Sequence, residues 1–139
     1  MTDGQLPVSL RLAIDALMDG IPQSALQAAS DHLSSAYRRD AGRSGAIRSS
    51  FDRLAYIATR LPATFSATKA ALGELRYRCP DLKAESLLEL GAGPATGLWA
   101  AHAVFSELVR ATHIETDHGT VELGQQLLRD TGISDTVIS

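Results

Sequence analysis

The stretch Ser86-Leu-Leu-Glu-Leu-Gly-Ala-Gly-Pro-Ala-Thr-Gly97 decides the fold. It starts with a short apolar run, which is typical of a buried strand, and continues into a loop that contains Gly91 and Gly93. A helical pattern of apolar residues follows directly. Glycine lets the backbone turn sharply and approach a ligand, and the free N–H groups at a helix start point into the same space. The stretch therefore predicts a strand, a ligand-binding loop and a helix, in that order.

Glu89 lies two positions before Gly91 and favours one class of ligand over another. In dinucleotide-binding folds the first strand usually ends apolar, and a pyrophosphate sits at the helix N-terminus. Here Thr96 replaces the third glycine of the G-x-G-x-x-G pattern, and the Glu89 carboxylate would repel a pyrophosphate. The same carboxylate suits the positively charged ammonium and sulfonium groups of S-adenosylmethionine. The pattern therefore predicts S-adenosylmethionine rather than NAD, with a glycine turn that binds no ligand as the alternative.

A second acid, at the end of the next predicted strand, supports the same ligand. Glu115 follows Gly91 by 24 residues, close to the roughly 20-residue interval of a nucleotide-binding strand–helix–strand unit. We expect its carboxylate to accept hydrogen bonds from both ribose hydroxyls. An ordinary acidic strand end is the alternative, and Asp117 is a rival two residues later. His113 and His118 lie beside these acids, but such alternation seldom makes a metal site, so we predict no metal.

Hydrophobic spacing divides the chain into a helical front and a back in which strands alternate with helices. In the front we expect helices over residues 8–18, 24–37, 47–60 and 62–77. In the back we expect strands over 86–90, 111–115 and 135–139, with helices over 95–109 and 121–129. Such alternation predicts a parallel sheet with right-handed crossovers. The predicted fold class is therefore α/β, with a helical N-terminal region over 1–82 followed over 83–139 by the first half, about three parallel strands, of a Rossmann-type methyltransferase sheet.

Composition places the chain among globular proteins that act inside the cell. Its 139 residues suffice for one domain, and 45% of them are hydrophobic and 21% charged. No apolar run approaches the roughly 20 residues that span a bilayer, and the polar N-terminus lacks the pattern of a secretory signal. Cys79 is the single cysteine, which excludes an internal disulfide. We therefore expect a cytoplasmic protein.

The net charge of −3 conceals an uneven distribution along the chain. Residues 1–83 carry 11 Lys and Arg against 8 Asp and Glu, whereas residues 84–139 carry 2 against 8. Six arginines fall within residues 38–60, where two aspartates oppose them. A basic front of this kind suits contact with nucleic acid, and scattered arginines on a solvated helical surface are the simpler alternative.

Four segments carry a resemblance to a known family, namely residues 56–65, 86–94, 98–101 and 114–124. The more specific blocks are Arg60-Leu-Pro-Ala-Thr-Phe65 and the Gly-Ala-Gly-Pro loop. From about Leu6 to Leu128 the chain resembles the methyltransferase-like proteins associated with the mitochondrial small ribosomal subunit, together with their bacterial relatives. The resemblance implies an S-adenosylmethionine-dependent fold, a helical N-terminal extension, and association with small-subunit ribosomal RNA or its assembly.

Several residues have expected roles around the cofactor. Arg60, Thr64 and Phe65 precede the core and would fold over the cofactor, with Arg60 meeting its carboxylate. The alternative is a plain helix junction, for which Pro62 and Phe65 are equally suited. No residue is identified as the catalytic base. The remaining expected cofactor contacts are Gly91, Ala92 and Gly93 to the methionine part, Glu89 to its ammonium and Glu115 to the ribose.

Two departures from the family pattern bear on activity. Ala95 stands where such loops commonly have glycine, which tightens the room for the ligand. The complete fold has further strands, so the chain would be a fragment whose unpaired sheet edge favours association with another copy. The expected function is methyl transfer to ribosomal RNA, catalysed mainly by alignment of the reactants. The alternatives are a non-catalytic ribosome-assembly or RNA-binding module, and a methyltransferase that acts on a small molecule or a protein.

Overall fold

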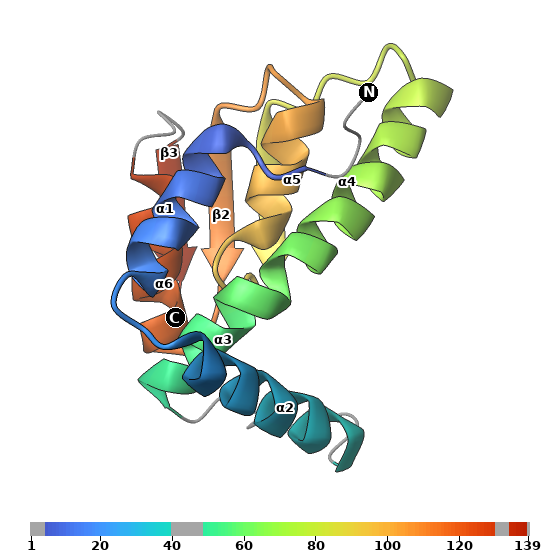
Figure 1. Cartoon of the computed structure of the whole chain (residues 1–139). Helices are drawn as coiled ribbons and strands as arrows, with labels where there is room; N and C mark the ends of the chain where they lie inside the picture. The colour runs from blue at the N-terminus through green and yellow to red at the C-terminus, as the bar shows by residue number, and fades with distance from the viewer. Residues whose placement is uncertain (1–4, 40–48, 130–133, 139) are drawn as a thin grey trace.

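The computed structural model describes residues 5–39, 49–129 and 134–138, as six helices and a small parallel sheet within these ranges (Figure 1). The predicted loop over 40–45 and the predicted start of the third helix at residue 47 lie outside the described residues. The elements are α1 (Val8–Met18), α2 (Gln23–Arg39), α3 (Ser50–Thr59), α4 (Leu61–Arg78), β1 (Ser86–Leu90), α5 (Thr96–Val104), β2 (Arg110–Ile114), α6 (His118–Leu128) and β3 (Ser134–Ile138).

Local sequence signals explain where the front helices begin and end. The left-handed Gly20 follows α1, and Pro22 then precedes α2. Helix α3 begins with a capping box, in which the Ser49 hydroxyl accepts the Asp52 N–H and the Asp52 carboxylate accepts the Ser49 N–H, each at 3.0 Å. A single residue, Arg60, separates α3 from α4, whose first turn contains a proline. The two helices therefore form an elbow.

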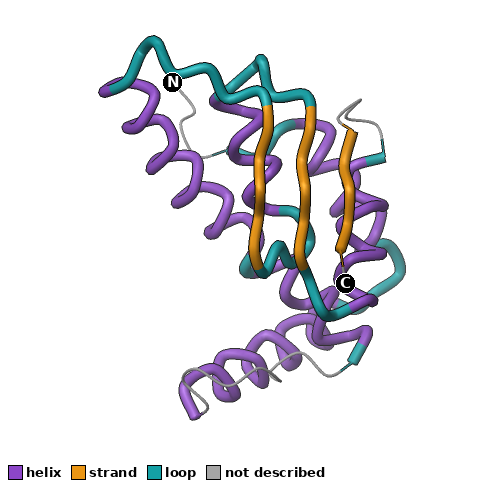
Figure 2. Tube along the Cα trace, turned by 180° about the vertical axis from the view of Figure 1, so that it is seen from behind, coloured by secondary structure: helices purple, strands orange, loops and turns teal. Residues whose placement is uncertain are grey.

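The described helices all lie on one face of the sheet. Strand β1 pairs in parallel with β2, with Glu89 opposite His113, and β2 pairs in parallel with β3 in the order β1-β2-β3. Figure 2 shows the strands bare in front and the helices behind them. On the bare face Leu88 and Leu90 are 61% and 70% exposed, and Ile114 beside Leu90 is 37% exposed.

One hydrophobic core joins the helical front to the sheet. Leu10 from α1, Phe65 from α4, Leu98 from α5 and Leu127 from α6 belong to one cluster of buried side chains. Helix α4 packs along α5, and α1 packs against α6. These contacts confirm a helical N-terminal region attached to a small parallel sheet. That the sheet is the first half of a Rossmann-type methyltransferase fold, and that a domain boundary falls near residue 83, remain predictions.

Several predicted element ends need correction. Helix α5 ends at Val104 rather than at residue 109, because Phe105 is extended and the chain turns before β2. Helix α6 begins at His118 rather than at residue 121, because the Asp117 side chain accepts the Thr120 N–H and caps it. Helix α2 begins at Gln23, so Ser24 lies inside the helix and is not its cap.

None of the helices in the described part of the chain is both long and apolar enough to cross a membrane.

A two-pronged ion pair links the elbow to the start of α6. Arg53 Nε and Nη2 donate to the two carboxylate oxygens of Asp117 at 2.7 and 2.6 Å. The side chains are 21% and 33% exposed. Their approach requires Gly119, because a Cβ there would lie 2.5 Å from Arg53 Cζ. The hydrogen bond from Arg53 holds the pKa of Asp117 well below its usual range.

This ion pair predicts a pH-dependent contribution to stability. A carboxylate whose pKa is lowered by folding stabilises the fold above its unfolded pKa and loses that effect as pH falls toward the folded value. Asp117→Asn keeps a capping side chain but removes the charge, and should cost about 1–2 kcal/mol at pH 7, less than a fully buried pair would. In urea unfolding, the difference from wild type should persist down to about pH 4 and narrow below it. A difference that stayed constant down to pH 2 would contradict the assignment.

Candidate functional site

The turn between β1 and α5 is held in an unusual backbone conformation. Gly91, Gly93 and Ala95 have φ values of 64°, 55° and 61°. Two N–H groups of the loop, those of Gly91 and Ala92, donate to the Ile114 carbonyl at 2.8 and 3.2 Å. The left-handed conformation at Ala95 is one that glycine adopts without strain and alanine adopts at a cost.

The Glu89 carboxylate sits at the N-terminus of α5. Its Oε1 accepts the Gly97 N–H at 2.9 Å, and the N-terminal residue Ala95 provides no side-chain cap of its own. A Cβ on Gly97 would lie 2.2 Å from Glu89 Oε1, so this approach depends on glycine. Burial raises the pKa of Glu89, while the hydrogen bonds from the backbone of Gly97 and Leu98 oppose that rise. Because a carboxylate already occupies the helix start, a phosphate cannot take the same place.

Within the described residues, two buried oxygens at this helix start have no hydrogen-bond partner. They are Glu89 Oε2 and Thr96 Oγ1. The nearest basic group described for Glu89 is His113 Nε2, 3.9 Å from Oε2 and beyond hydrogen-bond distance. Buried polar atoms are nearly always hydrogen-bonded in folded proteins, so these two indicate a place where a ligand or water donates.

Both residues border a pocket of about 300 Å³ between the glycine loop and the helical front. The pocket lies where β1 ends, which is the edge of a parallel sheet that commonly binds ligands. Thr64, a predicted contact, is on its wall, together with Gly91, Ala92 and Gly93 of the loop. The complete lining is Tyr56, Thr64, Thr68, Leu72, Leu87, Glu89, Gly91, Ala92, Gly93, Thr96 and Gly97.

The helical front supplies one whole wall of this pocket. Burial raises the pKa of the Tyr56 hydroxyl, and a hydrogen bond with Thr64 opposes that rise. Thr68 lies one helical turn beyond Thr64. Tyr56 and Thr68 were not predicted as site residues, although the spacing of Thr64 and Thr68 on one helix could have indicated the second.

Arg60 is not brought to the pocket. It donates to Ser34 Oγ at 2.8 Å, and its guanidinium lies over the Tyr37 ring. Both partners belong to α2, so the structure does not support the expectation that Arg60 meets the carboxylate of a cofactor. Arg60 follows Tyr56 by about one helical turn and is the residue between α3 and α4, but it does not line the pocket as Tyr56 does.

The Glu115 carboxylate holds the loop from the other side. Its Oε2 accepts the Gly93 N–H at 2.9 Å, and its Oε1 accepts from Thr116 and Asp117 at 2.7 and 3.0 Å. One protein donor on Oε2 leaves that oxygen able to accept another hydrogen bond. The ribose contact of Glu115 therefore stays a prediction with a free acceptor position. The rival Asp117 is instead engaged with Arg53 and with the start of α6.

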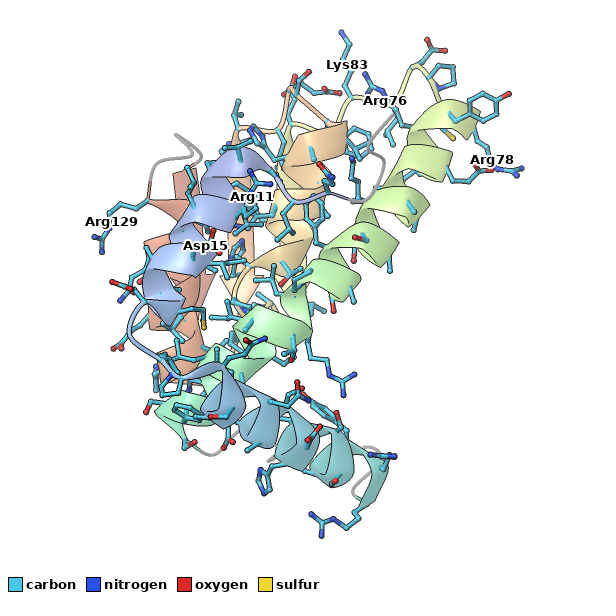
Figure 3. The ribbon with its side chains drawn as sticks, in the orientation of Figure 1. Arg11, Asp15, Arg76, Arg78, Lys83 and Arg129 are labelled. Atoms are coloured by element: carbon cyan, nitrogen blue, oxygen red, sulfur yellow. The ribbon has the colours of Figure 1, made fainter. Side chains whose placement is uncertain are left out.

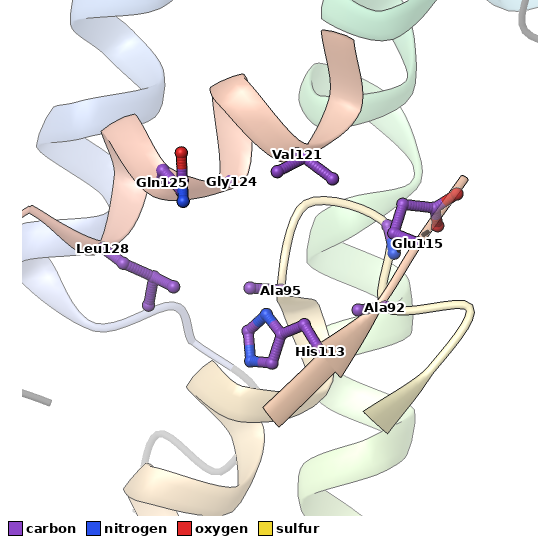
Figure 4. A pocket seen from close by; sticks show the side chains of 9 residues that line it. Ala92, Ala95, His113, Glu115, Val121, Gly124, Gln125 and Leu128 are labelled. Carbon is purple, nitrogen blue, oxygen red and sulfur yellow. Dashed lines mark hydrogen bonds between the residues drawn. The ribbon is translucent and has the colours of Figure 1, made fainter. Parts of the chain in front are cut away.

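A second cavity, shown in Figure 4, lies between the loop and α6. His113, Glu115 and Gln125 line it, and it measures about 10 Å³, which is the space of one water molecule. A Cβ on Gly124 would lie 3.1 Å from the Pro94 backbone, so α6 packs directly onto the loop. This cavity is too small for a cofactor. Within the described residues no three His, Cys, Asp or Glu side chains form a metal-binding group.

The contact between Gly97 and Glu89 predicts opposite effects for two glycine substitutions. Gly97→Ala should displace the Glu89 carboxylate and destabilise the fold by about 1–3 kcal/mol. Gly73→Ala is the matched control, because its Cβ would meet nothing within 4 Å and a helical alanine should add about 0.5–1 kcal/mol. Chemical unfolding of both variants checks this. Equal stability of the two variants would show that Glu89 does not depend on this close approach.

Comparisons with known proteins place the chain in a family. The family model described as "Mitochondrial small ribosomal subunit Rsm22" matches residues 50–137, more than half of the chain. The human "Ribosome assembly protein METTL17, mitochondrial" is 35% identical over 57 residues, which are 41% of this chain and 12% of that protein. The chain thus spans a small part of this relative's length. The family match covers the elbow, the glycine loop and the sheet, and on that ground the chain belongs to the mitochondrial small ribosomal subunit Rsm22 family.

Proposed function

We propose that this chain binds S-adenosylmethionine in the pocket between the glycine loop and α4, and that it serves assembly of the small ribosomal subunit by methylating ribosomal RNA. The observation that carries the proposal is the buried Glu89 carboxylate, whose Oε2 has no hydrogen-bond partner in the part of the chain that the structure describes. A buried carboxylate oxygen without a partner lowers the stability of the fold, and a cationic ligand that bound there would offset this cost. Such a group is therefore a candidate for ligand binding. The family supports the ribosomal setting.

The residues around the pocket fit this cofactor. An ammonium group is a donor without acceptors, and both Glu89 Oε2 and Thr96 Oγ1 can accept from it. A Cβ on Gly91 or on Gly93 would meet nothing within 4 Å, so the loop backbone leaves open space beside it. Glu89 also explains why a pyrophosphate cofactor does not fit, since its charge occupies the start of α5.

S-adenosylmethionine, when bound, supplies an electrophilic methyl group on a sulfonium. The chain's own residues would bind and orient it: Glu89 by its free oxygen, and Glu115 by the acceptor position that Gly93 leaves open. Tyr56, Thr64 and Thr68 would close the pocket from the elbow and exclude water on that side. Positioning of this kind is the main requirement of methyl transfer to a nucleophilic atom of RNA.

A non-catalytic assembly module is the second candidate function. The name of the human relative describes a ribosome assembly protein, and it mentions no transferase activity. On this alternative the pocket binds the cofactor as a structural ligand, which stabilises the fold by mass action.

The cytoplasmic location that the sequence predicts is also part of the proposed function.

Glu89→Gln separates cofactor binding from folding. Glutamine retains an oxygen that can accept the Gly97 N–H, but it removes the charge. We expect the melting temperature to stay the same or rise, because burial disfavours the charged form. We expect S-adenosylmethionine affinity in calorimetry to fall by about 10- to 100-fold. Glu74→Gln is the matched control, since that side chain is 56% exposed and pairs with Arg78 on the same helix, away from the pocket lining.

The pH dependence of binding tests the same carboxylate. Because the pKa of Glu89 is raised, it should become neutral at a higher pH than an ordinary glutamate. As pH is lowered, affinity of the wild type should therefore begin to fall at a higher pH than an ordinary glutamate would give, while that of Glu89→Gln should stay nearly constant. If the wild type does not bind S-adenosylmethionine at pH 7, the cofactor proposal is wrong. Binding without transfer of labelled methyl groups to small-subunit ribosomal RNA would select the non-catalytic alternative.

The bare face of the sheet motivates a proposal about association. Leu88, Leu90 and Ile114 are exposed there, and β1 is an edge strand. An open edge beside exposed apolar side chains favours pairing with another strand. We expect the chain to self-associate with rising concentration, and Leu90→Lys to weaken this. Light scattering that shows a monomer of wild type at all concentrations would contradict it.

A further inference from the structure

Two arginine side chains from different elements converge on Ser34, close to the end of α2. Arg60, in the elbow, donates from Nη2 to Ser34 Oγ at 2.8 Å. Arg38 donates from Nε to the Ser34 carbonyl oxygen at 3.2 Å. Ser34 thus accepts a hydrogen bond from each of two cationic side chains, which places two positive charges on the same side of α2 and favours binding of an anion there.

Tyr37 adds an exposed aromatic ring to this pair. The Arg60 guanidinium lies 5.9 Å from the ring centroid, within the range of a cation–π contact. The Tyr37 side chain is 46% exposed. A tyrosine that served only to pack the protein interior would be buried, because burial of the ring is what stabilises the fold. The ring is therefore both held in place and accessible.

Carboxylates do not neutralise this cluster within the described part of the chain. Neither Arg38 nor Arg60 forms an ion pair with a described aspartate or glutamate. Three other arginines do form ion pairs with carboxylates. The pairs are Arg53 with Asp117, Arg76 with Glu107 and Arg78 with Glu74. Arg53, one of the six arginines between residues 38 and 60, is thereby removed from any binding surface.

We propose that Ser34, Tyr37, Arg38 and Arg60 form a surface that binds single-stranded RNA. Guanidinium groups pair with phosphate oxygens by two parallel hydrogen bonds, and aromatic rings stack on unpaired bases. The choice of RNA as the polyanion rests on the proposed ribosomal function. The exposed ring distinguishes RNA from an acidic peptide, which would use the arginines and leave the aromatic surface unused.

The position of this surface relates it to the cofactor pocket. Tyr56 lines that pocket, and it lies near enough to Tyr37 and Arg60 for their charges to influence the pKa of its hydroxyl. Helix α2 contacts α3 and extends away from the sheet (Figure 1). RNA bound along the end of α2 would therefore approach the pocket from the side of the elbow.

Fluorescence anisotropy with a labelled single-stranded RNA of about ten nucleotides tests the proposal. Tyr37→Ala should weaken binding by about tenfold through loss of a stacked base. The double variant Arg38→Ala with Arg60→Ala should lower the slope of log affinity against log salt by about 1.4, because each lost phosphate contact contributes about 0.7. Arg38→Glu changes one exposed side chain and keeps the test valid if the double variant misfolds.

The control removes the same charge elsewhere. Arg11 and Arg129 are exposed on α1 and at the end of α6, away from α2 (Figure 3). Arg11→Ala with Arg129→Ala should leave both affinity and salt slope nearly unchanged. Equal losses in the control and in the Arg38 and Arg60 variants would overturn the proposal, as would a poly-glutamate peptide that binds as tightly as the RNA.

Calorimetry on the same proteins keeps the two proposals apart. If Arg38→Glu loses RNA binding and still binds S-adenosylmethionine like the wild type, both proposals stand. If the wild type binds the cofactor but not RNA, the surface assignment fails and the cofactor site remains. If the wild type binds RNA but not the cofactor, the cofactor proposal fails and the RNA surface remains.

Discussion

The passage from β1 to α5 is the constraint on which the rest of the structure depends. The chain must change from strand to helix between Leu90 and Thr96, and it does so with left-handed backbone at Gly91, Gly93 and Ala95. Such a turn brings the end of β1 close to the start of α5, so the Glu89 carboxylate can accept the Gly97 N–H. The free acceptor in the pocket and the exclusion of phosphate are both consequences of this geometry.

The helical front is part of the site because it is fixed to the core at two places. Helix α4 packs along α5, which sets the distance between the Thr64 wall and the glycine loop. The Arg53–Asp117 ion pair ties α3 to the start of α6, just after Glu115. Helix α6 in turn presses on the loop at Gly124. The loop is thus enclosed by helices that the sequence places both before and after it.

Periodicity and loop chemistry were sufficient to predict much of this arrangement. The strand at 86–90, the helix at 8–18 and the position of Glu89 beside the glycine turn follow from local patterns. The bond between Arg53 and Asp117 joins residues 64 positions apart, and local patterns do not report such contacts. For a related reason the sequence does not show that Arg60 contacts Ser34 and Tyr37 of α2, since local patterns do not report which way the elbow turns its side chains.

Tyr56 illustrates what remained beyond prediction. Its helix pattern is equally compatible with packing in the core, and the way α3 meets α4 at Arg60 makes it part of the pocket wall. Arg60, which follows Tyr56 in the elbow, donates instead to Ser34 of α2. Both the pocket and the arginine surface therefore depend on an elbow whose geometry is set by tertiary packing rather than by local propensity.

The most direct test of the pocket is a nitrogen-15 NMR titration of the chain with S-adenosylhomocysteine, which carries the same ammonium and ribose. The structure predicts that the amide signals of Gly91, Gly93 and Gly97 shift together with those of Thr64 and Thr68. It predicts no comparable change at Arg11 or elsewhere along α1. A titration that leaves the loop amides unchanged, or that shifts only residues remote from the pocket, would contradict the assignment of this loop as a cofactor site.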